Sequence, residues 1–190
     1  MIRTTRRRAA LLLFGALSAL TGRRDLMQLG GLDHDRERVF LLSTTHGAET
    51  HGLAAGIATM GEYQTKPVID TLYARGDQLR DGVARHIHDL KLGDRFSVSG
   101  RSCSLQFNTL GPDGKPSQEF RTLFLQELLA RNVLAPSFVV SYSHSTADID
   151  ATIAATGEAL RVYRAALADG ISRYLRGRPV QPVYRRYNRS

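Results

Sequence analysis

The chain has 190 residues, of which 42% are hydrophobic and 23% are charged. This balance is typical of a globular protein, with room for one domain or for one domain and part of another. Of the 26 basic residues 3 are lysines, which leaves 23 arginines to supply most of the net charge of +8. The arginines cluster densely only at residues 6–8 and 185–189. We therefore expect solvated basic tails and no nucleic-acid partner, because no interleaving of aromatic and basic residues is present.

One cysteine and a few separated histidines limit disulfides and metal sites. Cys103 has no second cysteine to pair with, which is compatible with a reducing compartment. His46 and His51 are five residues apart, and His86 and His88 are two apart. Neither spacing places two imidazoles well on one helix face, so we expect no metal site.

The first twenty residues allow two interpretations. Residues 3–8 read RTTRRR and residues 9–20 read AALLLFGALSAL, and a charged start before about a dozen apolar residues resembles a secretory signal. The stretch is too short to cross a bilayer, which needs about 20 residues. The alternative is an apolar strand or helix of a core behind a basic leader. These residues alone leave both open.

The segment up to residue 63 predicts short elements and one helix. We expect a strand at 16–22, a helical turn at 23–29, a break at Gly30-Gly31, a strand at 39–42 and a helix at about 47–63. Two isolated strands are marginally stable in water. We therefore expect the start of the chain to be the end of a larger sheet.

The rest of the chain predicts alternating helices and strands. We expect a helix from Pro67 to about 91, then strands at 96–100 and 102–109 joined by a turn at Gly100-Arg101. After a turn at 112–114, a helix should run from Ser117 to about 131, with Leu129 on its apolar face. An extended stretch at 133–142 then leads to a last helix, capped by Thr146 without a capping box. This order predicts an α+β fold, a small sheet covered by helices on one side.

A turn rich in hydroxyl groups precedes the predicted helix at 47–63. Ser43, Thr44 and Thr45 follow an apolar run, and Gly47 stands just before the small-residue helix. The first N–H groups of a helix lack partners and attract anions, so this turn is a suitable cradle for a phosphate. An ordinary N-cap before a tightly packed core helix explains the same residues.

Several dispersed segments, in the same order, resemble class III aminotransferases of the glutamate-1-semialdehyde 2,1-aminomutase branch. Residues 18–62, SALTGRRDLMQLGGLDHDRERVFLLSTTHGAETHGLAAGIATMGE, resemble the end of that family's large domain. Residues 130–163, ARNVLAPSFVVSYSHSTADIDATIAATGEALRVY, and residues 177–188, GRPVQPVYRRYN, resemble its C-terminal domain and tail. The resemblance implies the C-terminal portion of the aspartate-aminotransferase fold, an α/β to α+β arrangement. It also implies pyridoxal 5′-phosphate as cofactor and a homodimer.

The resemblance gives the hydroxyl turn a role. In this family a threonine of the motif G-T-x-x-G-N-P crosses the dimer interface and binds the phosphate of the neighbouring subunit's pyridoxal phosphate. Thr45 falls on that threonine, and Thr44 stands in place of the preceding glycine. Glu49 and Thr50 replace the usual Asn-Pro. The resemblance thus implies Thr45 and Thr44 as cofactor-binding residues.

Other positions depart from the family. Its catalytic lysine lies thirteen residues before the glycine that matches Gly22; that position is Ala9, and no lysine precedes Lys66. The acid that pairs with the pyridine nitrogen and the aromatic that stacks on the ring lie further upstream. An arginine that grips a carboxylate in some amine transaminases is replaced here by Ala135, which favours the aminomutase-like branch.

We therefore expect a truncated aminotransferase or aminomutase that moves an amino group between an amino compound and a carbonyl compound. The expected parts are residues 1–15 as a leader foreign to the family, 16–62 as the end of the large cofactor-binding domain, 63–176 as the small C-terminal domain and 177–190 as a basic tail. Without the lysine we expect the chain to be inactive alone, cytoplasmic and without a membrane partner. The alternative is a small basic, non-catalytic binding protein, exported or held by an anionic partner.

Overall fold

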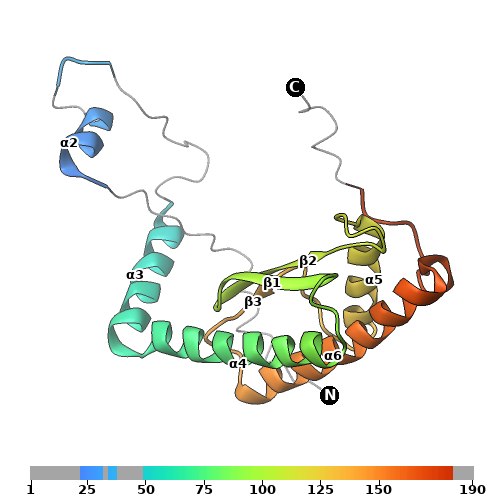
Figure 1. The fold of residues 1–190 in the computed structure, drawn as a ribbon. Coiled ribbons are helices and arrows are strands. Elements are labelled where there is room, and N and C mark those ends of the chain that lie inside the picture. Colours follow the sequence, from blue (N-terminus) through green and yellow to red (C-terminus); the bar gives the residue numbers. More distant parts are fainter. Residues whose placement is uncertain (1–21, 32–33, 38–48, 182–190) are drawn as a thin grey trace. The chain divides into compact units, whose positions relative to one another are not determined.

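A computed structural model of the protein describes residues 22–31, 34–37 and 49–181. The chain divides into two units, Met1–Pro67 and Val68–Ser190. The first contains α2 (Arg24–Met27), η1 (Gln28–Gly30) and α3 (Thr50–Thr65), labelled in part in Figure 1. The helical turn predicted at 23–29 is confirmed. The strand predicted at 39–42, and that at 16–22 apart from Gly22, lie outside the described residues.

Helix α3 lies close to its predicted position but is shifted along the chain. It begins after Glu49, whose side chain makes no capping hydrogen bond, rather than at about residue 47. It ends before Lys66, which is extended with φ −129° and ψ 150°. Pro67 explains this end, because the residue before a proline is driven out of the helical region.

The second unit is a three-stranded antiparallel sheet with helices on one face (Figure 1). The strand order is β1 (Phe96–Arg101), β2 (Ser104–Thr109) and β3 (Phe138–Val139). Three long helices and a short 3-10 turn complete it: α4 (Val68–Asp89), α5 (Gln118–Leu129), α6 (Thr146–Asp169) and η2 (Ile171–Arg173). This confirms the predicted α+β layout. Of the extended stretch at 133–142, only β3 pairs as a strand.

Alternation along the strands separates a core face from a polar face. Leu105 and Phe107 of β2 are buried, whereas Gln106 and Asn108 between and after them are exposed. The inner face is mainly aromatic: Phe96, Phe107, Phe124, Phe138, Phe120 and Tyr163 form tilted, stacked or edge-on ring pairs with centroids 4.8–6.4 Å apart. Such pairs add stability beyond the burial of their apolar area. The core of this unit therefore lies between the sheet and the helices.

The hairpin turn predicted at Gly100-Arg101 is wrong. Gly100 pairs with Leu105 and Arg101 pairs with Ser104, so the two-residue loop is Ser102-Cys103. The physical reason is a close contact between this loop and helix α4. A Cβ built on Gly76 of α4 would stand 2.3 Å from the backbone of Ser102. The loop is thus fixed by a close helix contact that strand alternation alone does not reveal.

Helices α4 and α6 also approach closely, because each presents a glycine to the other. A Cβ on Gly82 of α4 would lie 2.5 Å from Ile153, and a Cβ on Gly157 of α6 would lie 2.6 Å from the ring of His86. Protein interiors are close-packed, so these positions have no room for another carbon. Small residues therefore determine how near the two helices lie.

The helix starts are partly as predicted. Ser117 caps α5, with its Oγ accepting a hydrogen bond from the Phe120 N–H at 3.3 Å. The expectation for α6 is wrong by one residue: the cap is Ser145, and Asp148 completes a capping box with it. The N–H and Oγ of Ser145 both donate to the Asp148 carboxylate, which lowers the pKa of Asp148. Counting the motif from Thr146 missed this acid.

Leu129 is a further correction. The sequence placed it on the apolar face of α5, but its side chain is 60% exposed, whereas Leu128 beside it is fully buried. The face of α5 that contacts the core is narrower than the apolar residues in the sequence of α5 suggest. Leu129 instead lines a surface cavity, described below.

Replacing Gly76 by alanine tests the contact between α4 and the hairpin. We expect Gly76→Ala to lower the free energy of unfolding by about 1–3 kcal/mol, because the new methyl group overlaps backbone that must move. The matched control is Gly93→Ala, whose Cβ would have no neighbour within 4 Å and should stay within about 0.5 kcal/mol of the parent chain. Urea unfolding followed by circular dichroism measures both. Equal stability of the two variants would contradict the contact.

Candidate functional site

The residues predicted to bind the cofactor lie outside the described residues. This applies to Thr44 and Thr45, and also to Ala9, the residue that the sequence resemblance predicts at the position of the catalytic lysine. Their roles remain predictions. What the structure describes is the helix that follows the turn, α3, from Thr50 onwards.

Helix α3 carries an exposed apolar stripe. Leu53, Ile57 and Met60 are 53%, 68% and 57% exposed, and their spacing of four and three residues places them on one helix face. Contiguous exposed apolar surface of this kind is typical of an interaction surface. The small residue Gly56 is buried.

The described histidines and acids do not form a metal centre. His51 is exposed and lies 3.2 Å from the Glu49 carboxylate. His86 packs over Gly157, while the His88 side chain is 90% exposed next to Asp89. Within residues 22–31, 34–37 and 49–181, no three His, Cys, Asp or Glu side chains gather in a way that could hold a metal ion.

All three lysines lie in the described part of the chain, and each is exposed. Lys66 forms an ion pair with Glu62 at the end of α3. Lys91 follows α4 with a positive φ of 55°, and Lys115 lies in the turn after β2. A lysine that forms a Schiff base is normally desolvated or placed beside another cation, so that its amine is free to react. None of the three stands in such a place.

Ala135 lies beside a surface cavity of about 560 Å³. The cavity lies between the outer face of α5, the loop at 133–136 and the segment at 176–180. Its walls are mostly apolar, and Arg176 is the one charged residue among the described residues that line it. Ala135, which the sequence resemblance predicts to replace an arginine of some amine transaminases, is therefore part of an apolar wall here.

Arg121 of α5 fixes the loop that forms one side of this cavity. Its guanidinium donates a 2.8 Å hydrogen bond to the carbonyl of Pro136. It also lies over the Phe107 ring, 4.6 Å from the centroid. A guanidinium over an aromatic face is favourable, so Arg121 holds the loop against the sheet. The guanidinium atoms that make these contacts are therefore not available to a ligand.

Two polar side chains of α5 hold the C-terminal segment. Gln126 donates from Nε2 to the carbonyl of Tyr174 at 3.0 Å and accepts at Oε1 from the N–H of Arg176 at 2.8 Å. Thr122, one turn earlier, accepts at Oγ1 from the N–H of Val180 at 2.9 Å. The segment is thereby fixed along α5 by its backbone. Sequence analysis missed these contacts, because polar residues four apart on a helix usually face solvent.

An ion pair at the end of α5 completes this region. The buried Glu127 carboxylate accepts from Arg131 at 2.8 Å and from Gln126 at 3.0 Å. Burial by itself would raise the pKa of Glu127, but these hydrogen bonds and the charges of Arg131 and Arg176 outweigh it and leave the pKa lowered. Glu127 is therefore ionised near neutral pH and already has partners on both oxygens.

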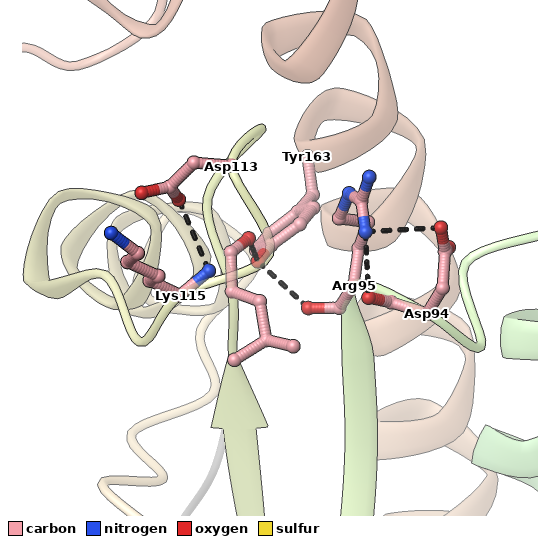
Figure 2. A network of polar contacts seen from close by, with 6 residues as sticks. Asp94, Arg95, Asp113, Lys115 and Tyr163 are labelled. Atoms are coloured by element: carbon pink, nitrogen blue, oxygen red, sulfur yellow. Dashed lines mark hydrogen bonds and ion pairs between the residues drawn. The ribbon is translucent and has the colours of Figure 1, made fainter.

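Tyr163 of α6 joins the helix layer to the sheet (Figure 2). Its buried hydroxyl lies 2.7 Å from the carbonyl oxygen of Leu110, to which it donates, and 3.2 Å from that of Arg95. Arg95 precedes β1 and Leu110 follows β2, so one hydroxyl ties the adjacent ends of both strands. Burial raises the pKa of Tyr163. Its place among backbone carbonyls indicates a structural role and not that of an acid catalyst.

Comparison with solved structures identifies the fold. The chain is 22% identical to the FumI protein of Sphingopyxis sp. MTA144, solved in its PLP internal aldimine form, with a TM-score of 0.57 over 70% of this chain and 31% of that one. It is 20% identical to an omega-transaminase from Sphaerobacter thermophilus, with a TM-score of 0.59 over 75% of this chain and 34% of that one. The chain thus has part of the fold of these proteins, and it spans about a third of their length.

No model of a protein family matches the sequence, and no curated protein matches it. Among the helices that the structure describes, none is both long enough and apolar enough to cross a membrane.

Tyr163→Phe tests the tie between α6 and the strand ends. At pH 7 we expect a loss of about 1–3 kcal/mol in the free energy of unfolding, because the Leu110 carbonyl loses the donor that Tyr163 supplies. The pKa of Tyr163 is raised above its ordinary value of 10, so the folded state holds this proton more tightly than the unfolded state. Its contribution is complete below about pH 10 and is lost as the pH rises further.

The parent chain should therefore lose about 1 kcal/mol more than Tyr163→Phe between pH 9 and pH 11. Urea unfolding of both proteins at pH 7, 9, 10 and 11 measures the difference. Parallel stability curves across this range would show that the hydroxyl is not buried as described.

Proposed function

We propose that the chain is the C-terminal part of a class III pyridoxal-phosphate-dependent aminotransferase and supplies its small domain and the end of its large domain. The observation that carries this proposal is the shared fold, with TM-scores of 0.57 and 0.59 to the FumI protein and the omega-transaminase. The resemblance of residues 18–62, 130–163 and 177–188 to that family supports it independently. The expected activity of the whole enzyme is transfer of an amino group between an amino compound and a carbonyl compound.

The described residues do not fit the reactive end of the cofactor. Pyridoxal phosphate supplies a conjugated ring that withdraws electrons from a bound amine. A lysine must hold its aldehyde, and the three lysines of this chain are exposed. We therefore assign no catalytic residue to the chain. We propose that the lysine and the ring-binding residues belong to another part of the enzyme, so that this polypeptide is inactive alone.

Within this proposal, Thr45 and Thr44 bind the phosphate of the cofactor. A hydroxyl and the unpaired N–H groups ahead of a helix provide the donors that a phosphate needs. The exposed stripe of Leu53, Ile57 and Met60 on the helix that follows supports a subunit interface nearby. We therefore also propose a homodimer, in which these threonines bind the phosphate of the neighbouring subunit's cofactor. We propose that the enzyme is cytoplasmic.

Ala135 supports the aminomutase-like branch over amine transaminases that carry an arginine at this position. The side chain is half-buried and lines an apolar wall. The methyl group of Ala135 cannot make the carboxylate contact that this arginine makes in those enzymes. The proposed reaction is therefore that of the glutamate-1-semialdehyde 2,1-aminomutase-like branch, with internal exchange or transfer of the amino group.

Adding pyridoxal phosphate to the 190-residue chain tests the absence of a cofactor lysine. After borohydride reduction and tryptic mass spectrometry, we expect only weak labelling spread over Lys66, Lys91 and Lys115, because each is an ordinary exposed amine. Labelling of one lysine near one equivalent, with a visible absorbance band, would contradict the proposal that this chain lacks that residue.

The DNA upstream of the Met1 codon tests the family assignment. Translated in all three frames, it should encode a segment somewhat longer than the present chain, because matches over 70–75% of this chain cover only 31–34% of the solved chains. One reading frame should run on from this upstream segment into the sequence that encodes the present chain. Read in that frame, the codon thirteen positions before that of Gly22 should encode a lysine. No aminotransferase-like segment in any frame would argue against the proposal.

If that segment is found, the joined polypeptide tests Thr45. A lost hydrogen bond to a charged phosphate costs about 1.5–3 kcal/mol, so Thr45→Ala should weaken cofactor binding about 10- to 100-fold. Thr59→Ala is the control, because the Thr59 hydroxyl bonds to the Ala55 carbonyl of its own helix. Equal binding by both variants would remove Thr45 from the site.

A further inference from the structure

A second surface hollow lies beside α6 and shares no lining residue with the cavity next to Ala135. It measures about 560 Å³, which is within the range of about 300–1,000 Å³ typical of small-molecule sites. Three alanines of α6 line it: Ala151, Ala154 and Ala155. Because the side chain of alanine is a single methyl group, these residues leave the space next to the helix open. We call this space the α6 hollow.

Three nitrogen-bearing side chains line the α6 hollow, each from a different part of the second unit. His86 lies in the last turn of α4, Arg131 follows α5, and Arg161 belongs to α6. Segments far apart in the sequence therefore place one imidazole and two guanidiniums around one space. Glu158 is the one acid among the described residues that line it. Nitrogen donors thus outnumber carboxylates in the wall.

Arg131 is held in place and keeps donors for a ligand. Its Nη1 donates to the carbonyl and to the carboxylate of Glu127, at 2.7 and 2.8 Å. The buried Glu127 also accepts from Gln126 at 3.0 Å, which fixes this carboxylate from both sides. The edge of the guanidinium formed by Nε and Nη2 has no hydrogen bond to the described residues. A guanidinium oriented in this way loses little side-chain entropy when that edge binds an anion.

Arg161 and His86 also keep donors. Arg161 uses Nη1 in an ion pair with Glu158, and both side chains are more than half exposed, so this pair is weak and opens easily. The His86 ring packs over Gly157, where an added Cβ would lie 2.6 Å from it. Within the described residues the ring has no hydrogen-bond partner. Packing therefore orients the imidazole and leaves its N–H for a ligand.

We propose that the α6 hollow binds a small molecule through a phosphate monoester group. Such a group carries a charge of about −1.5 to −2 at pH 7 and three strong acceptor oxygens. Two guanidiniums and an imidazole from three segments match these oxygens better than the two coplanar oxygens of a carboxylate. The rest of the ligand lies against the alanines of α6. The site goes beyond the proposed aminotransferase function, because it needs neither Thr45 nor pyridoxal phosphate.

Ribose 5-phosphate and ribose, which lacks the phosphate, test the charged part of the site. Titration calorimetry of the full 190-residue chain in about 0.1 M salt should show one site for ribose 5-phosphate and no binding of ribose. Arg161→Gln should weaken the binding about 10- to 100-fold, because a hydrogen bond to a charged group is lost. Arg164→Gln is the matched control: it removes the same charge from the same helix, but residue 164 does not line the hollow. This variant should stay within about twofold of the parent chain, since salt screens distant charges.

A second pair of variants tests the alanine lining. Ala154 and Ala168 are both exposed residues of α6, so leucine at either position should leave the helix and the fold intact, as circular dichroism would show. Leucine at position 154 fills part of the hollow and should weaken binding of ribose 5-phosphate severalfold. Ala168→Leu should leave binding unchanged, because residue 168 does not line the hollow. Inorganic phosphate should bind the parent chain severalfold more weakly than ribose 5-phosphate.

Four results would each overturn the proposal. They are the absence of ribose 5-phosphate binding to the parent chain, equal binding of ribose, equal losses in Arg161→Gln and Arg164→Gln, and equal affinity for inorganic phosphate and ribose 5-phosphate. None of these measurements involves the cofactor or the hydroxyl turn, so a negative result here leaves the proposed aminotransferase function untouched.

Discussion

The burial of one aromatic sheet face under three helices is the constraint on which the second unit depends. Phe96 and Phe107 of the strands meet Phe124 of α5 and Tyr163 of α6. A three-stranded sheet is barely stable unless one face is covered, and here the cover must come close. The absence of a side chain at Gly76 follows from this need, because α4 meets the hairpin backbone directly.

Helix α5 has two faces with different tasks, and this explains the position of the surface cavity. Its inner face places Leu123, Phe124 and Leu128 in the core. Its outer face uses Thr122 and Gln126 to hold the C-terminal segment by the backbone. Because backbone contacts leave side chains free, Arg176 and Val180 of that segment are able to line a cavity instead of filling it.

Local sequence predicted the elements of the second unit well, and it failed where a distant partner decides. The α+β order, the Ser117 cap and the turn at 112–114 follow from periodicity and turn chemistry over a few residues. The hairpin loop does not, since its register depends on α4. The Ser145 capping box was missed by counting from the wrong residue, and the clamp by Gln126 has no sequence signature. For the candidate site, the hydroxyls of Thr44 and Thr45, which are predicted to bind a phosphate, lie outside the described residues.

Fold and chemistry are separable in this chain. The second unit has a core of its own, with Phe124, Leu160 and Tyr163 fully buried, although the matches of the chain cover only about a third of each solved structure. This core therefore forms without the side chains that a cofactor site would require. Single residues agree with this: the lysines are exposed, and Ala135 lines an apolar wall. Stability measured on this chain therefore reports on this core.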